Sequence, residues 1–125
     1  MIVDQNPSTL RVEKPWGHFE QFTHNALSTV KVITVDPGGT LSLQYHHRRD
    51  ELWVSMDPGA RVELGDRVIQ PETGEKVFIP RRMPHRLCAI GSTAVRILEV
   101  SFGEFDEDDI VRVEDVYGRA GSPTP

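Results

Sequence analysis

The sequence has a single cysteine, Cys88, so no disulfide can form within the chain. Cys88 lies in an apolar run, where we expect a buried and unreactive thiol. At 125 residues the chain has the length of one domain, and a domain of this size can bury enough surface to be stable without a disulfide. We therefore expect one domain, with an ordered core over about residues 10–119 and flexible termini.

Long apolar runs and excess positive charge are also absent. No segment approaches the roughly 20 apolar residues of a membrane helix, and the first residues lack the basic flank and apolar stretch of a secretory signal. The formal net charge is -5, whereas a general nucleic-acid binder needs a basic surface. We expect neither a membrane nor a nucleic acid as partner, and a cytoplasmic location.

The charges that are present are separated along the chain. Acidic residues gather near the end, over residues 104–109, whereas arginine pairs occur at Arg48-Arg49 and Arg81-Arg82. An acidic protein with such local basic pairs has room for an anion site.

No segment of ten or more residues has the amphipathic pattern of a helix. Instead, short runs of β-branched and apolar residues are separated by turns rich in Pro, Gly and Asp. The runs expected to form strands are 29–35, 41–46, 51–56, 60–64, 67–70, 76–80, 86–90 and 94–102. Eight to ten short strands at nearly regular spacing indicate an all-β sandwich or barrel, and residues 106–115 could add a short helical turn.

Strand alternation brings metal-ligating side chains together. Gln44 and His46 are two residues apart and share one face of a strand. Glu51 opens the next run and can approach both if the two strands pair as neighbours, and His85 could close the site from across a barrel. A buried Glu beside two His and no Lys is costly unless a cation neutralises it. This pattern favours a divalent ion bound by Gln44, His46, Glu51 and His85.

Mixed nitrogen and oxygen ligands are compatible with Zn²⁺, Mn²⁺, Fe²⁺, Ni²⁺ or Co²⁺ and do not choose among them. The other histidines, His18, His24 and His47, are expected to be surface or structural residues.

The spacing of these ligands resembles the two cupin motifs. Gly38, Gln44, His46 and Glu51 stand at the spacing of the first motif, with Gln in place of its first His. The second motif is resembled by Gly74, Pro80 and His85, although Arg82 and Ala89 replace its later Gly and Asn. The resemblance implies the cupin fold, a double-stranded β-helix or jelly-roll barrel.

A closer resemblance extends over residues 11–119. It is carried by Lys14–Gly17, Lys31–Gly38, Leu41–Arg48, Phe78–Pro80, Pro84–Leu87 and Glu107–Arg112. These segments are similar to the cupin domain of type II mannose-6-phosphate isomerases. In that family the domain often follows a mannose-1-phosphate guanylyltransferase domain, which this sequence does not contain, so a free-standing member is expected.

The resemblance implies interconversion of mannose 6-phosphate and fructose 6-phosphate. A divalent ion would polarise the sugar carbonyl and stabilise an enediolate. Lys31 and Arg112 match family positions and are the candidate catalytic, substrate-contacting residues. Arg81 and Arg82 are candidates for phosphate binding, because Arg offers a bidentate fork to an anion. The sequence departs from the family at Leu52, where His is common, and in the turn at Pro58-Gly59.

Two other functions fit the residues. One is a non-catalytic, metal-containing cupin that binds a sugar phosphate or a nucleotide sugar; the other is an Fe²⁺ oxygenase. The arginine pairs favour an anionic sugar over the apolar substrate of an oxygenase. Apolar residues on both faces of the run 29–35 predict a homodimer, because a monomer would expose one apolar face to water.

Overall fold

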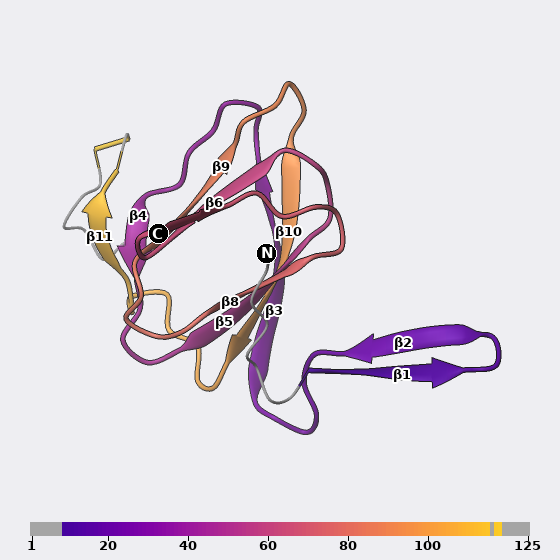
Figure 1. Ribbon diagram of the computed structural model, residues 1–125. Helices are drawn as coiled ribbons and strands as arrows, with labels where there is room; N and C mark the ends of the chain where they lie inside the picture. The colour runs from indigo at the N-terminus through magenta and orange to yellow at the C-terminus, as the bar shows by residue number, and fades with distance from the viewer. Residues whose placement is uncertain (1–8, 116, 119–125) are drawn as a thin grey trace.

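The computed structural model describes residues 9–115, 117 and 118, and within these residues every regular element is a β-strand (Figure 1). The strands are β1 (Leu10–Lys14), β2 (Gly17–Gln21), β3 (Ser28–Val35), β4 (Leu43–Tyr45), β5 (Asp50–Ser55), β6 (Ala60–Leu64), β7 (Arg67–Ile69), β8 (Lys76–Ile79), β9 (His85–Ala89), β10 (Val95–Phe102) and β11 (Val111–Glu114). In this part of the chain no helix is long and apolar enough to cross a membrane. The termini expected to be flexible lie outside the described residues.

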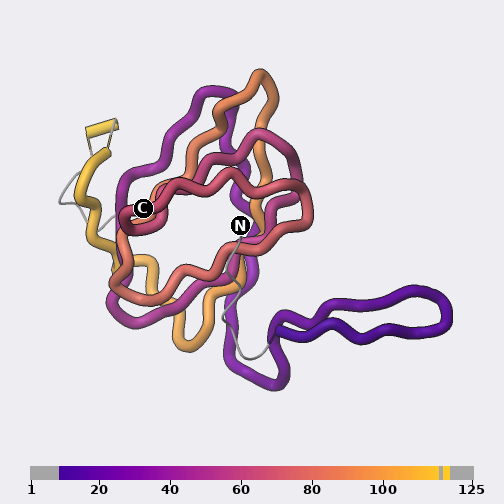
Figure 2. Tube along the Cα trace, in the orientation of Figure 1, coloured from indigo at the N-terminus to yellow at the C-terminus, as the bar shows by residue number. Residues whose placement is uncertain are grey.

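Two antiparallel sheets enclose the interior. One has the strand order β3-β10-β5-β8 and the other has the order β11-β4-β9-β6-β7. In the Cα trace the strands of these two sheets form a closed barrel, and the β1-β2 hairpin extends away from it (Figure 2). The expected all-β jelly-roll architecture is confirmed.

The apolar alternation located eight of the strands to within two residues at each end. The β1-β2 hairpin was missed, and so was β11, because its residues were assigned to a possible helical turn. In the structure that segment begins with a single turn, closed by a hydrogen bond from the Asp109 amide to the Asp106 carbonyl (3.0 Å), and then continues as a strand.

The strand carrying Gln44 does not pair with the strand carrying Glu51, so the condition set for their approach is not met. β4 pairs with β9 and β11, whereas β5 pairs with β10 and β8 in the other sheet. Residues 46–49 form a corner, the His46 corner, that takes the chain from one sheet to the other. The amides of His47 and Arg48 donate to the side chain of Asp109 instead of closing a hairpin, so the two strands separate.

The inward face of the barrel changes character along the strands. Twelve buried apolar residues form one cluster, including Trp53, Leu87 and Ile97. Toward the opposite end of the same strands the inward side chains become polar or charged: Lys31, Glu51, His85, Glu99 and Ser101. The apolar cluster thus closes one end of the barrel, and the charged side chains line the other.

Candidate metal centre

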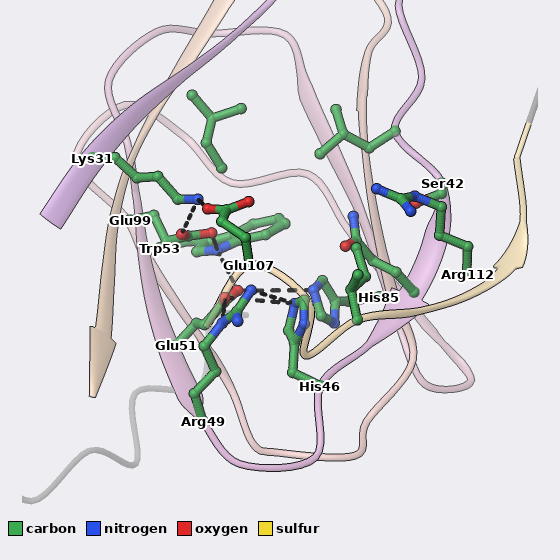
Figure 3. A pocket seen from close by; sticks show the side chains of 14 residues that line it. Lys31, Ser42, His46, Arg49, Glu51, Trp53, His85, Glu99, Glu107 and Arg112 are labelled. Carbon is green, nitrogen blue, oxygen red and sulfur yellow. Dashed lines mark hydrogen bonds and ion pairs between the residues drawn. The ribbon is translucent and has the colours of Figure 1, made fainter. Parts of the chain in front are cut away.

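A cavity of about 230 Å³ occupies the charged end of the barrel (Figure 3). Its charged and polar wall consists of Lys31, Ser42, Gln44, His46, Arg49, Glu51, His85, Glu99, Glu107 and Arg112. Trp53 and three aliphatic residues complete the lining. The four residues predicted as metal ligands and both candidate catalytic residues therefore face the same space.

The predicted ligands reach the cavity from both sheets. Gln44 on β4 is the register partner of His85 on β9, so these two side chains are neighbours in one sheet. Glu51 faces them from β5 in the other sheet. His46 follows β4 directly and lies in the corner between the sheets. His85 thus closes the site from across the barrel relative to Glu51, as expected, but it stands beside Gln44.

Two imidazoles and one carboxylate converge in this cavity. His46 Nε2 lies 3.6 Å from Glu51 Oε2, and His85 Nε2 lies 3.8 Å from Glu51 Oε1. One ligand atom from each of the three residues falls within 4.8 Å of the others. The exposed fractions of the side chains are 4% for His46, 1% for Glu51 and 2% for His85, so water screens this group very little.

Both imidazoles are held in one tautomer by the backbone. His46 Nδ1 is 2.7 Å from the Asp109 carbonyl oxygen, and His85 Nδ1 is 3.0 Å from the Met83 carbonyl oxygen. A carbonyl oxygen can only accept, so each Nδ1 carries the proton and donates it. In the neutral ring, each Nε2 then presents a lone pair toward Glu51. This outer hydrogen bond is the arrangement commonly found behind metal-bound histidines.

Burial keeps these imidazoles neutral. It lowers the pKa of His46 to about 4, although the nearby Glu51 carboxylate opposes the shift. Burial likewise lowers the pKa of His85. Two lone pairs and a carboxylate face one another here, and all three are acceptors. A cation between them turns this repulsion into attraction, so the group fits a divalent ion bound by His and Glu.

A buried arginine beside Glu51 was missed as part of the site. Arg49 was expected only as half of an arginine pair near an anion site, but it is 6% exposed, and its Nε donates to Glu51 Oε2 at 2.9 Å. Its Nη2 lies 3.4 Å from His46 Nε2. Glu51 therefore already has one cationic neighbour, which the prediction of a metal ion had not included. The two-residue spacing of Arg49 and Glu51, which is that of one strand face, was the available signal.

The charge state of Glu51 follows from these neighbours. Burial disfavours the charged form, but the hydrogen bond and the positive charge of the Arg49 guanidinium favour it, and the pKa of Glu51 lies below its ordinary value. Glu51 is therefore an ionised carboxylate at neutral pH, the form that binds a cation.

A second buried carboxyl, Glu99, shares the site and was also missed. Trp53 Nε1 lies 3.2 Å from Glu51 Oε1 and 3.1 Å from Glu99 Oε2, so one indole donor bridges two carboxyl groups. Burial and then the negative charge of Glu51 raise the pKa of Glu99 to about 7, against the lowering effect of Lys31. No local sequence pattern marks Glu99, because its partners lie on other strands.

Lys31 and Arg112 both line the cavity. Lys31 Nζ is 3.7 Å from Glu99 Oε1 and 3.3 Å from Glu107 Oε1, and it lies 4.6 Å from the centre of the Phe105 ring. Arg112 is buried on β11, where it is the register partner of Gln44. The cavity thus holds a lysine and two arginines opposite three glutamates.

Arg81 and Arg82 are not among the residues that line the cavity. They lie in the turn between β8 and β9, where the Arg81 amide donates to Asp50 at 2.7 Å. Arg82 has a positive φ of 67°, and its amide donates to the His46 carbonyl at 2.6 Å. The structure places this turn beside the His46 corner but outside the cavity wall.

Leu52, the departure from the family pattern, does not line the cavity either. It alternates with Glu51 and Trp53 on β5, so its side chain is buried on the outer face of the sheet. This substitution therefore leaves the cavity wall unchanged.

Comparison with known proteins identifies relatives of most of the chain. Residues 4–115 match the family described as "Mannose-6-phosphate isomerase C-terminal". The xanthan biosynthesis protein XanB of Xanthomonas campestris pv. campestris is 42% identical over 110 residues, which are 87% of this chain and 24% of that protein. The alginate biosynthesis protein AlgA of Pseudomonas aeruginosa is 40% identical over 113 residues, 90% of this chain and 24% of that protein. The chain thus spans about a quarter of these relatives' length.

Two solved structures share the fold. A protein with a double-stranded beta-helix domain from Klebsiella pneumoniae has a TM-score of 0.56 at 17% identity, over 81% of this chain and 82% of that chain. A sugar phosphate isomerase of the cupin superfamily from Silicibacter pomeroyi has a TM-score of 0.56 at 18% identity, over 62% of this chain and 51% of that chain. At these identities the likeness establishes the cupin fold alone.

Proposed function

The chain belongs to the mannose-6-phosphate isomerase C-terminal family, and from this premise we propose that it is a metal-dependent aldose-ketose isomerase. The proposed reaction interconverts mannose 6-phosphate and fructose 6-phosphate. The observation that carries the proposal is the pair of neutral Nε2 atoms facing Glu51, in a cavity that also contains cationic side chains.

The proposed metal ligands are Gln44, His46, Glu51 and His85. A divalent ion bound there would supply a Lewis acid for the oxygens at C1 and C2 of the sugar. The protein's own part is to orient the ligands: the two backbone carbonyls fix the imidazole tautomers, and Arg49 holds the Glu51 carboxylate.

The reaction moves a proton between two carbon atoms, so it needs an ionisable group in the cavity. Lys31 and Glu99 approach each other to 3.7 Å on the wall next to Glu51. We assign the proton transfer to this pair, with Glu99 holding the proton between the two steps. Their direct pairing keeps the lysine charge close to the carboxyl group as it gains and loses the proton.

An anionic substrate also needs positive charge in the cavity. Lys31 and Arg112 are the proposed contacts to the sugar phosphate, because both lie in the wall. Arg81 and Arg82 remain proposed phosphate ligands from the turn beside the His46 corner, where a long side chain could reach over the rim. Either pair would bind a phosphate through charge-assisted hydrogen bonds.

The direct test is turnover by the metal-loaded protein. Incubation with mannose 6-phosphate and Zn²⁺, Mn²⁺, Co²⁺ or Ni²⁺ in turn should yield fructose 6-phosphate. A Gln44→Ala, His46→Ala double variant serves as the empty-site control, and we expect it to lose both bound metal and at least about 100-fold of the activity. Absence of conversion with every metal would refute the isomerase proposal.

One observation favours the non-catalytic alternative. Because Arg49 already neutralises Glu51, the cavity can hold an anion such as a sugar phosphate or a nucleotide sugar without a reaction taking place. Saturable binding of mannose 6-phosphate without turnover would support this function instead.

We also propose a homodimer in which a second copy covers the outward face of β3, at the edge of the β3-β10-β5-β8 sheet. β3 is an edge strand of that sheet, and its outward Val30 and Val32 are 56% and 52% exposed. On the same face of the neighbouring strands Val100 and Leu52 are already buried, so the exposed apolar patch is confined to β3. A Val30→Lys, Val32→Lys variant should halve the mass measured by light scattering; an unchanged mass would exclude this face. A cytoplasmic location completes the proposal.

A further inference from the structure

Asp109, in the connection between β10 and β11, accepts three hydrogen bonds from the His46 corner. The Asp109 carboxylate accepts from the His47 amide through Oδ1 at 2.9 Å and from the Arg48 amide through Oδ2 at 3.0 Å. The Asp109 carbonyl oxygen accepts from His46 Nδ1 at 2.7 Å. Asp109 is 7% exposed and lies 63 residues after His46 in the chain.

The two imidazoles of the metal centre are positioned in different ways. His85 belongs to β9, and its Nδ1 donates to Met83, two residues away. His46 lies beyond the end of β4, and its Nδ1 donates to a residue from a distant segment. Strand pairing and a local contact therefore fix His85, whereas the position of His46 depends on the β10-β11 connection.

We propose that Asp109 is a positioning residue for the metal centre, an inference that rests on the proposed metal site. Its carboxylate holds the two amides of the corner, and this contact brings its own carbonyl oxygen to His46 Nδ1. The carbonyl selects the tautomer with Nδ1 protonated and turns Nε2 toward Glu51. Loss of the carboxylate frees the corner from the connection, and His46 loses its fixed orientation.

The first test measures metal affinity in the full-length protein. Asp109→Ala removes both bonds to the corner, and Asp109→Asn keeps one acceptor while its NH₂ group faces an amide donor. We expect Zn²⁺ affinity, measured by competition with a chromophoric chelator, to fall about 10- to 100-fold in Asp109→Ala and by less in Asp109→Asn. Asp108→Ala is the matched control, because it removes the same charge one residue away from an exposed side chain. The Zn²⁺ affinity of Asp108→Ala should stay within about twofold of the wild-type value.

The second test uses the metal-free protein and does not depend on any metal being bound. In ¹⁵N-histidine NMR spectra, the Nδ1 proton of His46 should be observable in the wild type and in Asp108→Ala, and lost to exchange in Asp109→Ala. The His85 signal, which depends on Met83, should persist in every variant and so reports that the barrel is folded. If Asp109→Ala does not fold, Asp109→Asn is expected to show a weakened His46 signal.

The two measurements separate the possible failures. A wild type that binds none of Zn²⁺, Mn²⁺, Fe²⁺, Co²⁺ and Ni²⁺ would refute the metal site, while the NMR result would still decide the role of Asp109. A variant that unfolds at lower temperature but keeps both the wild-type affinity and the His46 proton signal would show that Asp109 only stabilises the fold. That result would overturn the inference.

Discussion

The two ends of the barrel interior are built on the same strands but have opposite chemistry. On β10, Val95 and Ile97 belong to the apolar cluster, and two and four residues later Glu99 and Ser101 line the charged end. The register partners follow the same change, because Ile97 faces Ile33 on β3 whereas Glu99 faces Lys31.

This difference separates stability from function. Burial of aliphatic side chains stabilises the fold by roughly 1.5–3 kcal/mol for each one fully buried. Buried charges cost desolvation energy, and even when paired they add little net stability. The charged end is therefore expected to be a net cost to folding that the apolar end offsets. Four substitutions test this division, from the largest expected effect to the smallest.

Shortening a side chain at the apolar end should reduce stability alone. Ile97 is 1% exposed, so Ile97→Ala is expected to lower the free energy of unfolding by about 2–5 kcal/mol, as measured by urea denaturation. Val32→Ala, at a half-exposed position on β3, should lower the free energy of unfolding much less. Metal affinity of folded Ile97→Ala should match the wild type. A large loss of affinity would show that the two ends are not independent.

Removing an ionisable group at the charged end should change how stability depends on pH. The pKa of Glu99 rises from its ordinary 4.5 to about 7 on folding, so this group makes the protein less stable as pH rises through that window. Glu99→Gln removes the effect. We expect the free energy of unfolding of the chelator-treated variant to rise by roughly 2–3 kcal/mol relative to wild type as the pH is raised from 4.5 to 8.

His46 has the opposite effect on the pH dependence of stability. Its pKa falls from 6.5 to about 4 on folding, so its contribution to stability is present above pH 6.5 and is lost as the pH falls toward 4. In the wild type the two effects partly cancel, whereas in Glu99→Gln stability should rise steadily with pH over this window. A pH dependence identical to that of the wild type would contradict a buried Glu99 with a raised pKa.

Trp53 stands where the two ends meet, and Trp53→Phe tests their junction. The substitution keeps an aromatic ring but removes the Nε1 donor shared by Glu51 and Glu99. We expect a loss of about 1–3 kcal/mol in the free energy of unfolding of the chelator-treated protein. Trp16→Phe, at a 73% exposed site, is the control and should change it by less than about 0.5 kcal/mol. Equal effects at the two tryptophans would mean that the shared donor contributes nothing.

The smallest expected effect concerns the exposed rim of the charged end. Glu107 pairs with Lys31, so it competes with any anion that approaches the lysine. Glu107→Gln should tighten binding of inorganic phosphate a few-fold in calorimetry, and less so at high salt. Glu104→Gln, an exposed residue in the same connection, should leave the affinity unchanged. Weaker binding in Glu107→Gln would instead make Glu107 part of the anion site.

Most of the fold could be predicted from local patterns in the sequence. Runs such as 60–64 and 94–102 alternate and end at turn residues, and they became β6 and β10 with almost unchanged bounds. The pairing of strands could not be predicted in this way. A four-residue corner is compatible with a hairpin or with a change of sheet, and Asp109, more than 50 residues away, takes up the amides that a hairpin would have used.

The site was predictable to the extent that its residues lie in a motif. His46, Glu51 and His85 converge as the spacing indicated. The role of Arg49 was missed because the Arg48-Arg49 pair was expected to serve an anion, whereas Arg49 turns inward and pairs with Glu51 and Arg48 stays exposed. Glu99 could not be found from the sequence, because it meets Lys31 and Trp53 only through pairing of distant strands.

The ligands of the proposed metal centre come from both sheets, with Glu51 on β5 opposite His85 on β9. An ion bound between them would act as a cross-link that ties the two halves of the sandwich together at its open rim. Separation of the sheets would then require release of the ion, so breathing motions that admit water between them should become rarer. Amide hydrogen exchange in β5 and β9 should slow together on loading, while exchange in the outlying β1-β2 hairpin stays the same.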